Sequence, residues 1–174
     1  MTTLAERIAP VELLVLDVDG VLTDGCIVYA DGGAEVKAFH VRDGSALTLW
    51  KRAGRRAAIV TGRSSPVVDR RAAELGVGTV IQGAGDKGEA LRRVLAKMGL
   101  RPEQACAVGD DLFDLPMLAG AGLAVAVADA CPEVRAAAHY VTRAGGGRGA
   151  VRELVELLLR GQGRWQALVD AIRG

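Results

Sequence analysis

The sequence predicts an α/β fold in which helices cover a mostly parallel β-sheet. Short apolar runs alternate with longer amphipathic stretches along the chain, which is typical of such a sheet. The run Leu13–Leu16 is apolar at every position, as expected for a strand that is buried on both faces. The 174 residues suit a single domain over residues 1–174 with one hydrophobic core.

The first half of the chain gives clear local signals. Asp31-Gly32-Gly33 is a turn signal between two apolar arms, so a protruding hairpin is predicted at about 25–40. Leu47 and Trp50 share one face of the next segment, which is therefore predicted as a helix. In order, the predicted elements are a strand at 13–16, hairpin arms at 26–30 and 34–39, a helix at 43–53, a strand at 57–60, and a helix at 65–75 with Pro66 in its first turn.

The second half continues the same alternation of short apolar runs and amphipathic segments. Its predicted strands lie at 79–81, 105–108, 123–127 and 140–141, and its predicted helices at 87–98, 112–119, 132–138 and 151–159. The C-terminal tail at about 161–174 is predicted to be helical from Trp165. These local patterns do not determine a strand order.

Composition and charge exclude several classes of protein. The net charge is +1, which gives no reason to expect nucleic acid or a membrane as a partner. No apolar run approaches the length of a membrane span, and the start of the chain lacks the pattern of a signal peptide, so a cytoplasmic protein is expected. The three cysteines are scattered and form no CxxC pair, which argues against a zinc site or a disulfide framework.

Polar side chains collect where the predicted strands end, which is where open α/β sheets carry their chemistry. They are Asp17 and Asp19 after the first strand, Thr61-Gly62-Arg63 after the second, Lys87 after the third, and Asp110-Asp111 after the fourth. Carboxylates of this kind form the hard oxygen site that Mg²⁺ prefers. The set therefore predicts magnesium-dependent phosphoryl transfer.

Each residue type has a role in that chemistry. Asp17 is predicted to attack phosphorus and form an aspartyl-phosphate, which divides one hard displacement into two easier ones. Asp19 is predicted to protonate the leaving alkoxide and then to deprotonate the attacking water. Thr61 and the backbone at Gly62 can hydrogen-bond the phosphate oxygens, and Lys87 can stabilise the charge of the transition state.

At these residues the chain resembles the haloacid dehalogenase superfamily. Its four motifs match Asp17-Val18-Asp19-Gly20-Val21-Leu22-Thr23, Thr61-Gly62-Arg63, Lys87, and Gly109-Asp110-Asp111 with Asp114 behind. The resemblance implies a three-layer Rossmann-like fold. It also implies a magnesium ion held by Asp17, Asp110 and the carbonyl of Asp19, with Asp111 and Asp114 supporting these ligands.

A narrower resemblance covers about residues 11–163. The stretches 17–24, 41–44, 125–130, 140–143 and 146–153 together resemble the 3-deoxy-D-manno-octulosonate 8-phosphate phosphatases of lipopolysaccharide synthesis. That family implies a magnesium-dependent homotetramer without a cap domain. The spacing agrees, because the gaps between Asp19 and Thr61 and between Thr61 and Lys87 are too short for a lid. The hairpin is expected to form the contacts between subunits, and the C-terminal tail is expected to cover the active site of a neighbouring subunit.

The family's substrate contacts fall on residues that could bind a phosphate and a sugar carboxylate. They are Asp19, His40, Val41, Arg42, Asp43, Gly44, Thr48, Gly62, Arg63, Arg71 and Lys87. Guanidinium groups suit both anions. His40 and Asp86 stand where many relatives are expected to carry Asn. These departures leave a nine-carbon sugar-acid phosphate open as an alternative substrate.

Three other interpretations fit the sequence less well than a phosphatase does. The stretch Gly83 to Gly88 matches GxGxxG, but a dinucleotide fingerprint belongs at the first strand, which ends here in Asp17. A signalling receiver domain also uses acids, a Thr and a Lys, but Thr61 comes too early for it. A non-catalytic oligomerisation domain would not require the complete motif set.

Overall fold

The computed structural model describes residues 2–174, and within them six parallel strands form one sheet. The strand order is β5-β4-β1-β6-β7-β8. The strands are β1 (Leu13–Leu16), β4 (Arg56–Val60), β5 (Val80–Ile81), β6 (Ala105–Gly109), β7 (Leu123–Ala126) and β8 (Tyr140–Val141). The predicted α/β class is confirmed, and β1 occupies the middle of the sheet, between β4 and β6.

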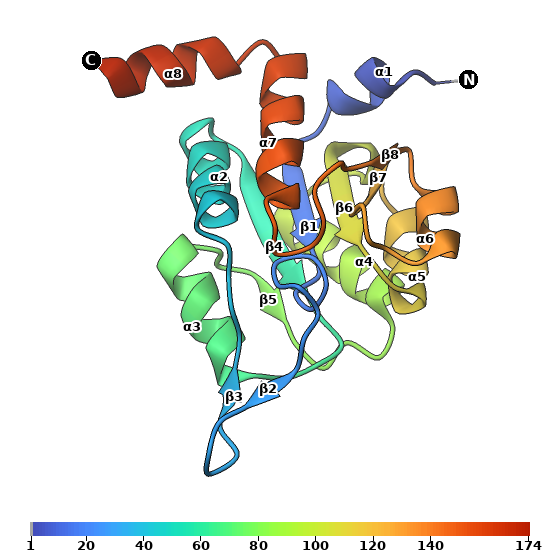
Figure 1. The fold of residues 1–174 in the computed structure, drawn as a ribbon. Helices are drawn as coiled ribbons and strands as arrows, with labels where there is room; N and C mark the ends of the chain where they lie inside the picture. The colour runs from blue at the N-terminus through green and yellow to red at the C-terminus, as the bar shows by residue number, and fades with distance from the viewer. Residues whose placement is uncertain (1) are drawn as a thin grey trace.

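Helices cover both faces of this sheet, with α2 and α7 in front and α4 behind in Figure 1. The helices are α1 (Leu4–Ile8), α2 (Val41–Arg52), α3 (Pro66–Leu75), α4 (Lys87–Met98), α5 (Leu115–Ala119), α6 (Pro132–Ala137), α7 (Ala150–Gly161) and α8 (Trp165–Arg173). Two short 3-10 turns, η1 (Pro102–Gln104) and η2 (Leu112–Asp114), flank β6. The layers are thus helix, sheet and helix.

The core is aliphatic, as the low aromatic content requires. All four residues of β1 are completely buried, because helices cover both faces of the central strand. Trp50 is the largest fully buried side chain, and its indole Nε1 donates to the carbonyl of Arg56 at 2.7 Å. This bond ties α2 to the start of β4 and satisfies the one polar atom of the buried ring.

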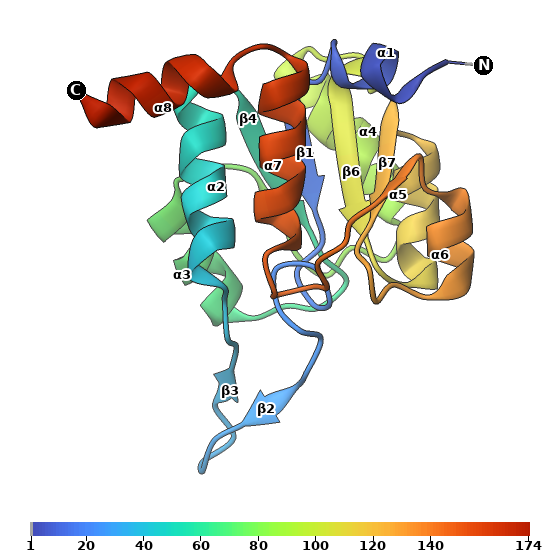
Figure 2. The same ribbon diagram turned by 45° about the horizontal axis from the view of Figure 1, so that its top comes forward.

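The hairpin is a separate two-stranded ribbon of β2 (Val28–Tyr29) and β3 (Glu35–Val36). It projects beyond the carboxyl ends of the sheet strands, at the bottom of Figures 1 and 2. Its paired arms are much shorter than the predicted 26–30 and 34–39, because an isolated ribbon has no third strand to extend its ladder. Val28 and Tyr29 are 49% and 63% exposed, so the ribbon presents apolar side chains to its surroundings.

Several element boundaries differ from the prediction for local reasons. The helix predicted at 112–119 divides into η2 and α5, because Asp111 caps the first turn and accepts the backbone N–H of Leu112 at 2.8 Å. The helix α1 was not predicted, although Thr3 and Glu6 form a capping box that the sequence contains. The remaining helices and strands lie within a few residues of their predicted positions.

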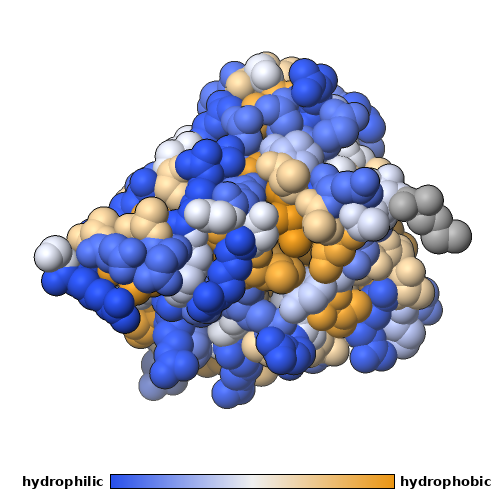
Figure 3. Space-filling view, turned by 90° about the horizontal axis from the view of Figure 1, so that it is seen from above, coloured by the Kyte–Doolittle hydropathy of each residue, from blue (hydrophilic) through white to orange (hydrophobic). Residues whose placement is uncertain are grey.

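The end of the molecule away from the hairpin carries both termini and the helix α8 (Figure 2). Figure 3 looks onto this end and shows hydrophilic side chains around the edge of the view with an apolar area near its middle. The indole of Trp165 lies against the guanidinium groups of Arg152 and Arg160, at 5.4 and 4.8 Å from the ring centroid, which fixes α8 to α7. Within residues 2–174, no helix has both the length and the apolarity that crossing a membrane requires.

Candidate active site

Asp17 lies in a cleft at the carboxyl edge of the sheet. It follows β1 directly, and its backbone N–H donates to the carbonyl of Val108 at 3.2 Å. This bond continues the pairing with β6 one residue past the strand, so the backbone of Asp17 is fixed by the centre of the sheet. Its side chain is only 8% exposed.

The predicted catalytic and metal-binding residues all line this cleft, whose volume is about 550 Å³. Four strand ends and the segment before the hairpin contribute to its wall, as predicted for the chemistry-bearing edge of an open α/β sheet. The lining residues are Asp17, Asp19, Gly25, Ile27, Thr61, Gly62, Arg63, Ala84, Gly85, Lys87, Asp110, Asp111, Phe113 and Asp114.

Lys87 is the first residue of α4, and its ammonium group lies between two carboxylates. Nζ is 2.9 Å from Oδ1 of Asp17 and 2.5 Å from Oδ1 of Asp114. Burial pushes the pKa of Lys87 down, but the two carboxylates outweigh burial and raise the pKa above its ordinary value. Asp86 caps the helix by accepting the backbone N–H of Glu89 at 3.0 Å, and Asp and Asn serve equally in that role.

Asp114 supports the site from behind. While its Oδ1 binds Lys87, its Oδ2 accepts the backbone N–H groups of Asp110 and Asp111 at 2.9 and 3.3 Å. These bonds shape the turn after β6 and orient the neighbouring Asp110. Gly20 permits a close approach on the other side, because its φ is +91° and an added Cβ would lie 2.0 Å from Oδ2 of Asp110.

The acidic cluster has the properties of a cation site. Carboxylate oxygens of Asp17, Asp110 and Asp114 lie within 4.8 Å of one another. Within residues 2–174, the buried Oδ1 of Asp110 has no hydrogen-bond partner. Both oxygens of Asp114 bind Lys87 or backbone N–H groups, whereas Asp17 contacts Lys87 through Oδ1 alone, so Asp17 and Asp110 suit a metal better than Asp114. Their role as metal ligands stays a prediction. Three acids with one lysine leave a net negative charge that a hard divalent cation would neutralise.

Burial and the excess of negative charge both raise the pKa values of these acids. Burial, followed by the charge of Asp114, raises the pKa of Asp17 to about 6, although Lys87 opposes the shift. Burial, followed by the charges of Asp17 and Asp114, raises the pKa of Asp110 to about 7. A bound cation would favour the ionised forms and reverse both shifts.

The end of β4 supplies the opposite wall of the cleft. Thr61 is 2% exposed, and its backbone N–H donates to the carbonyl of Ile81 at 2.9 Å, which fixes it against β5. Gly62 and Arg63 follow it along the wall. A hydroxyl, a glycine backbone and a guanidinium thus line one wall of the cleft together.

The glycine-rich loop before α7 packs against the catalytic loop. An added Cβ on Gly146 would lie 1.7 Å from the carbonyl oxygen of Gly20, so only glycine fits there. The backbone N–H of Gly147 donates to the carbonyl of Val21 at 2.9 Å. These contacts explain Gly146 and Gly147 as packing requirements of the loop that carries Asp19.

The stretch His40 to Gly44 lies outside this cleft. Asp43 is buried, and its carboxylate accepts the backbone N–H groups of Gly149 and Arg152 at 3.2 and 2.8 Å, which caps α7 from α2. His40 Nδ1 lies 3.7 Å from the same carboxylate. Val41 is 77% exposed and Arg42 is exposed as well, so both are available to another molecule. Their contact with substrate stays a prediction.

Thr48 and Arg71 are also placed elsewhere in the single chain. Thr48 lines a second groove between α2 and α8, also of about 550 Å³, whose wall includes Arg52 and Trp165. Arg71 lies beside Gly44, with its guanidinium 3.1 Å from Glu74 and 5.5 Å from the ring centroid of Phe39. The predicted contacts of Thr48 and Arg71 with substrate therefore also stay predictions.

Two charged residues of the hairpin were missed in the sequence. Lys37 Nζ forms an ion pair with Oδ1 of Asp19 and lies 3.4 Å from Oε1 of Glu35. Glu35 in turn accepts from Arg63 at 3.1 Å. The spacing of Glu35 and Lys37 could have indicated that their side chains lie together, because residues two apart in an extended segment point to the same side.

The sequence and the fold are similar to those of known phosphatases. Residues 75–152 match the family model of haloacid dehalogenase-like hydrolases. The chain is 46% identical over 157 residues to the 3-deoxy-D-manno-octulosonate 8-phosphate phosphatase KdsC of Yersinia pestis, a match that covers 90% of this chain and 84% of the relative.

Solved structures agree along nearly the whole chain. The 3-deoxy-D-manno-octulosonate 8-phosphate phosphatase of Moraxella catarrhalis, in complex with magnesium, phosphate and KDO, superposes with a TM-score of 0.94 at 42% identity. The match covers 97% of both chains. The cobalt-bound Haemophilus influenzae phosphatase has a TM-score of 0.88 at 38% identity and covers 90% of this chain and 92% of that one.

Proposed function

This chain belongs to the 3-deoxy-D-manno-octulosonate 8-phosphate phosphatase family of haloacid dehalogenase-like hydrolases, and from that premise we propose how its own residues act. It is a magnesium-dependent phosphatase that converts 3-deoxy-D-manno-octulosonate 8-phosphate to the free sugar acid and phosphate, in lipopolysaccharide precursor synthesis. The predicted family, fold and cofactor are therefore confirmed. A receiver-like or non-catalytic domain is disfavoured, because the relatives are phosphatases.

The observation that carries the assignment of roles is the position of Asp17. Its carboxylate lies in the cleft beside the ammonium group of Lys87 and near the carboxylate of Asp110. An anionic nucleophile can approach an anionic phosphate only where positive charge surrounds both groups. Magnesium on Asp17, Asp110 and the carbonyl of Asp19 would supply charge neutralisation and alignment of the phosphate.

In the first step, an oxygen of Asp17 attacks phosphorus and the bond from phosphorus to the sugar oxygen breaks. Asp19 donates a proton to the departing oxygen, so the sugar leaves as an alcohol. Thr61 and the backbone at Gly62 hold the oxygens of the transferred group, and Lys87 offsets their charge. The product on the enzyme is an aspartyl-phosphate.

In the second step, water attacks phosphorus of the aspartyl-phosphate. Asp19, now ionised, accepts the proton from that water, and the bond from phosphorus to the oxygen of Asp17 breaks. Phosphate leaves, and both carboxyl groups return to their starting states. One acid thus serves both half-reactions.

Phosphate release from a panel of sugar phosphates tests the assignment. We expect turnover of 3-deoxy-D-manno-octulosonate 8-phosphate that requires magnesium and exceeds turnover of simple hexose phosphates. Asp17→Asn should abolish release and leave folding unchanged. Near-normal turnover by that variant would exclude the covalent mechanism.

A nine-carbon sugar-acid phosphate is the alternative substrate on the same scaffold. His40, at the start of α2, differs from the residue expected in many relatives, and this keeps the alternative open. Including a nine-carbon 9-phosphate in the panel decides between them. A higher kcat/KM on that compound would replace the eight-carbon assignment.

We also propose that the protein is a homotetramer in which neighbouring chains complete the cleft. Support comes from exposed apolar side chains of the hairpin, including Ile27, Val28 and Tyr29, and from the exposed Val41 and Arg42, which lie outside their own cleft. Light scattering of the purified protein measures the mass directly, and a monomer would contradict this proposal.

A cytoplasmic location is proposed as well. The chain's three cysteines, Cys26, Cys106 and Cys131, are free thiols, and free thiols suit a reducing compartment. Fractionation of cells that express the protein tests this location.

A further inference from the structure

We propose that Lys37 is a positioning residue that orients the carboxylate of Asp19, an inference that rests on the proposed role of Asp19 as acid and base. The ammonium group of Lys37 forms an ion pair with Oδ1 of Asp19. The side chain of Lys37 is only 1% exposed, which is unusual for a lysine. A buried charge of this kind is retained only where specific partners compensate for its loss of water.

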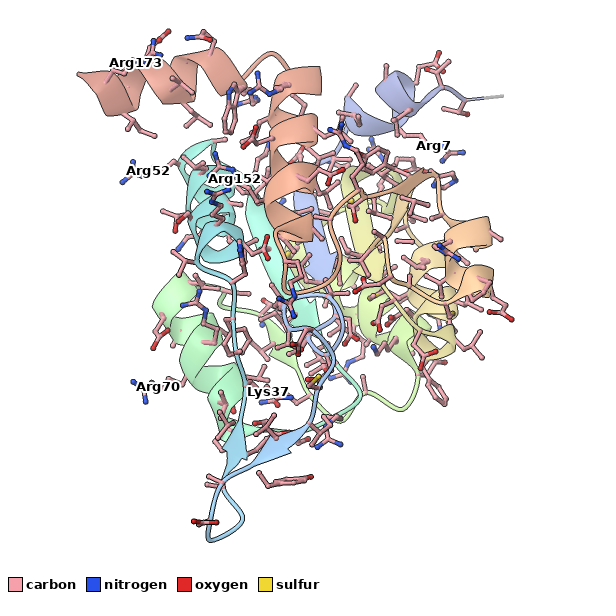
Figure 4. All side chains as sticks on the ribbon, viewed as in Figure 1. Arg7, Lys37, Arg52, Arg70, Arg152 and Arg173 are labelled. Carbon is pink, nitrogen blue, oxygen red and sulfur yellow. The ribbon has the colours of Figure 1, made fainter. Side chains whose placement is uncertain are left out.

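Lys37 reaches Asp19 from outside the catalytic cleft. Asp19 lines the cleft, whereas Lys37 is outside the set of residues that line it, in the part of the chain that the structure describes. Figure 4 shows Lys37 between the base of the hairpin and the loops at the carboxyl edge of the sheet. Among the described residues, its two charged contacts are Asp19, which lines the cleft, and Glu35, which does not, so Asp19 is the contact through which Lys37 would act on the reaction.

The two oxygens of Asp19 have different surroundings. Oδ1 forms the ion pair with Lys37. Oδ2 is buried and, within residues 2–174, forms no hydrogen bond. The nearby Nε of Arg63 is 3.8 Å from Oδ2, beyond hydrogen-bond distance. Holding one oxygen leaves the other free to exchange a proton with the leaving group.

Asp19 needs such a partner because of where it lies. It follows the end of β1 in a loop, outside any helix or strand, and its side chain is 17% exposed. An aspartate in that setting has several accessible rotamers. Proton transfer requires the acid within hydrogen-bond reach of the leaving oxygen, so fixing one rotamer raises the rate.

The hairpin carries the lysine in a defined orientation. Glu35 and Lys37 point to the same side of the arm, and Nζ of Lys37 is 3.4 Å from Oε1 of Glu35. Arg63 donates to the same oxygen at 3.1 Å. Glu35 thus connects the lysine to the end of β4, while the intervening Val36 is 46% exposed. The hairpin therefore holds Lys37 in place beside Asp19.

The test uses two substrates of nearly the same shape, phenyl phosphate and 4-nitrophenyl phosphate. Phenoxide, whose conjugate acid has a pKa of about 10 like that of tyrosine, needs a proton to leave, whereas 4-nitrophenoxide leaves without one. We expect Lys37→Met to lower kcat/KM on phenyl phosphate about 10- to 100-fold and on 4-nitrophenyl phosphate by less than about threefold. For both substrates, kcat/KM reports on the steps up to release of the phenol, before water attacks the aspartyl-phosphate.

A double-mutant cycle identifies the residue through which the lysine acts. Asp19→Asn should show the same selective loss, and adding Lys37→Met to it should cost nothing further. Lys97→Met, an exposed lysine on α4, is the matched control and should leave both rates unchanged. Thermal melting and light scattering establish that each variant is folded and assembled as the wild type is.

Equal losses on the two aryl phosphates, or a further loss in the Asp19→Asn background, would overturn the inference. The proposed function is judged separately, by turnover of 3-deoxy-D-manno-octulosonate 8-phosphate by the wild-type enzyme. An enzyme that hydrolysed the aryl phosphates but not this sugar phosphate would lose its substrate assignment while the role of Lys37 stood.

Discussion

The ammonium group of Lys87 lies 2.5 Å from Oδ1 of Asp114, and the two side chains are 7% and 1% exposed. Asp114 also accepts two backbone N–H groups from the turn that carries Asp110. One carboxylate therefore orients both Lys87 and Asp110, the proposed metal ligand. Residues that support ligands in this way contribute to activity without touching the substrate.

Replacing Asp114 should expose this supporting role. Asp114→Asn keeps an acceptor for Lys87 but substitutes an N–H₂ group that cannot accept from the backbone. We expect kcat to fall about 10- to 100-fold and the magnesium concentration for half-maximal rate to rise. Steady-state kinetics over a magnesium titration measures both. Asp69→Asn, on the exposed surface of α3, is the control, and unchanged kinetics in Asp114→Asn would contradict the role.

Lys87 should also matter for stability, because it compensates for two buried carboxylates. Lys87→Met leaves Asp17 and Asp114 without their cation, and we expect the free energy of unfolding to fall by about 3–5 kcal/mol in the metal-free protein near neutral pH. Urea denaturation measures the change. Lys97→Met on the same helix should stay within about 0.5 kcal/mol of wild type. Equal stability of the two variants would show that the buried pair contributes little.

The stability of the metal-free protein should depend on pH in a definite direction. The pKa of Asp17 is raised to about 6 and that of Asp110 to about 7, so the folded chain binds more protons than the unfolded chain between about pH 4 and pH 7. These groups then favour folding least at high pH. We expect their contribution to lower Tm as the pH rises from about 5 to 8.

Magnesium should reverse that trend, because it binds the ionised carboxylates. The rise in Tm on adding magnesium should be larger at about pH 8 than at about pH 5, and thermal melting with and without the metal measures it. Asp110→Asn removes one of the two raised groups and should melt higher than wild type without metal at about pH 8. A magnesium effect independent of pH would show that these acids are not its ligands.

Asp43 is predicted to hold α2 and α7 together. Its carboxylate caps the first turn of α7 through Gly149 and Arg152, so Asp43→Ala should cost about 2 kcal/mol of unfolding free energy. Urea denaturation measures this cost, with Asp31→Ala in the hairpin turn as control. If Asp43 also contacts substrate in the assembled enzyme, Asp43→Asn will raise KM. If Asp43→Ala had the same free energy of unfolding as wild type, the capping role of Asp43 would be contradicted.

The strands and the polar residues that line the cleft could be predicted because each depends on a local pattern. The buried strand β1 is apolar at every position, and the acids follow strands whose carboxyl ends meet at one edge. The cleft brings Asp17, Thr61, Lys87 and Asp110 together as expected. Neither the central place of β1 nor the order of its neighbours could be predicted, since strand order depends on contacts between distant segments.

The pairing of Lys37 with Asp19 shows a different limit of the sequence. The hairpin could be recognised from its turn, but its two short strands end before Lys37, and the direction in which it folds back onto the catalytic loop is a tertiary property. The predicted substrate residues Thr48 and Arg71 mark a further limit. Neither side chain lines the cleft of its own chain, so their predicted contact with a sugar does not follow from the fold of one chain.

The central place of β1 has a consequence for how the molecule opens. Its amides are paired on both sides, to β4 and β6, so they should be among the slowest in the protein to exchange with deuterium. Fraying at β8 can then proceed without breaking the backbone pairs that hold Asp17. Fraying at β5 would reach the cleft sooner, because the carbonyl of Ile81 holds Thr61 there.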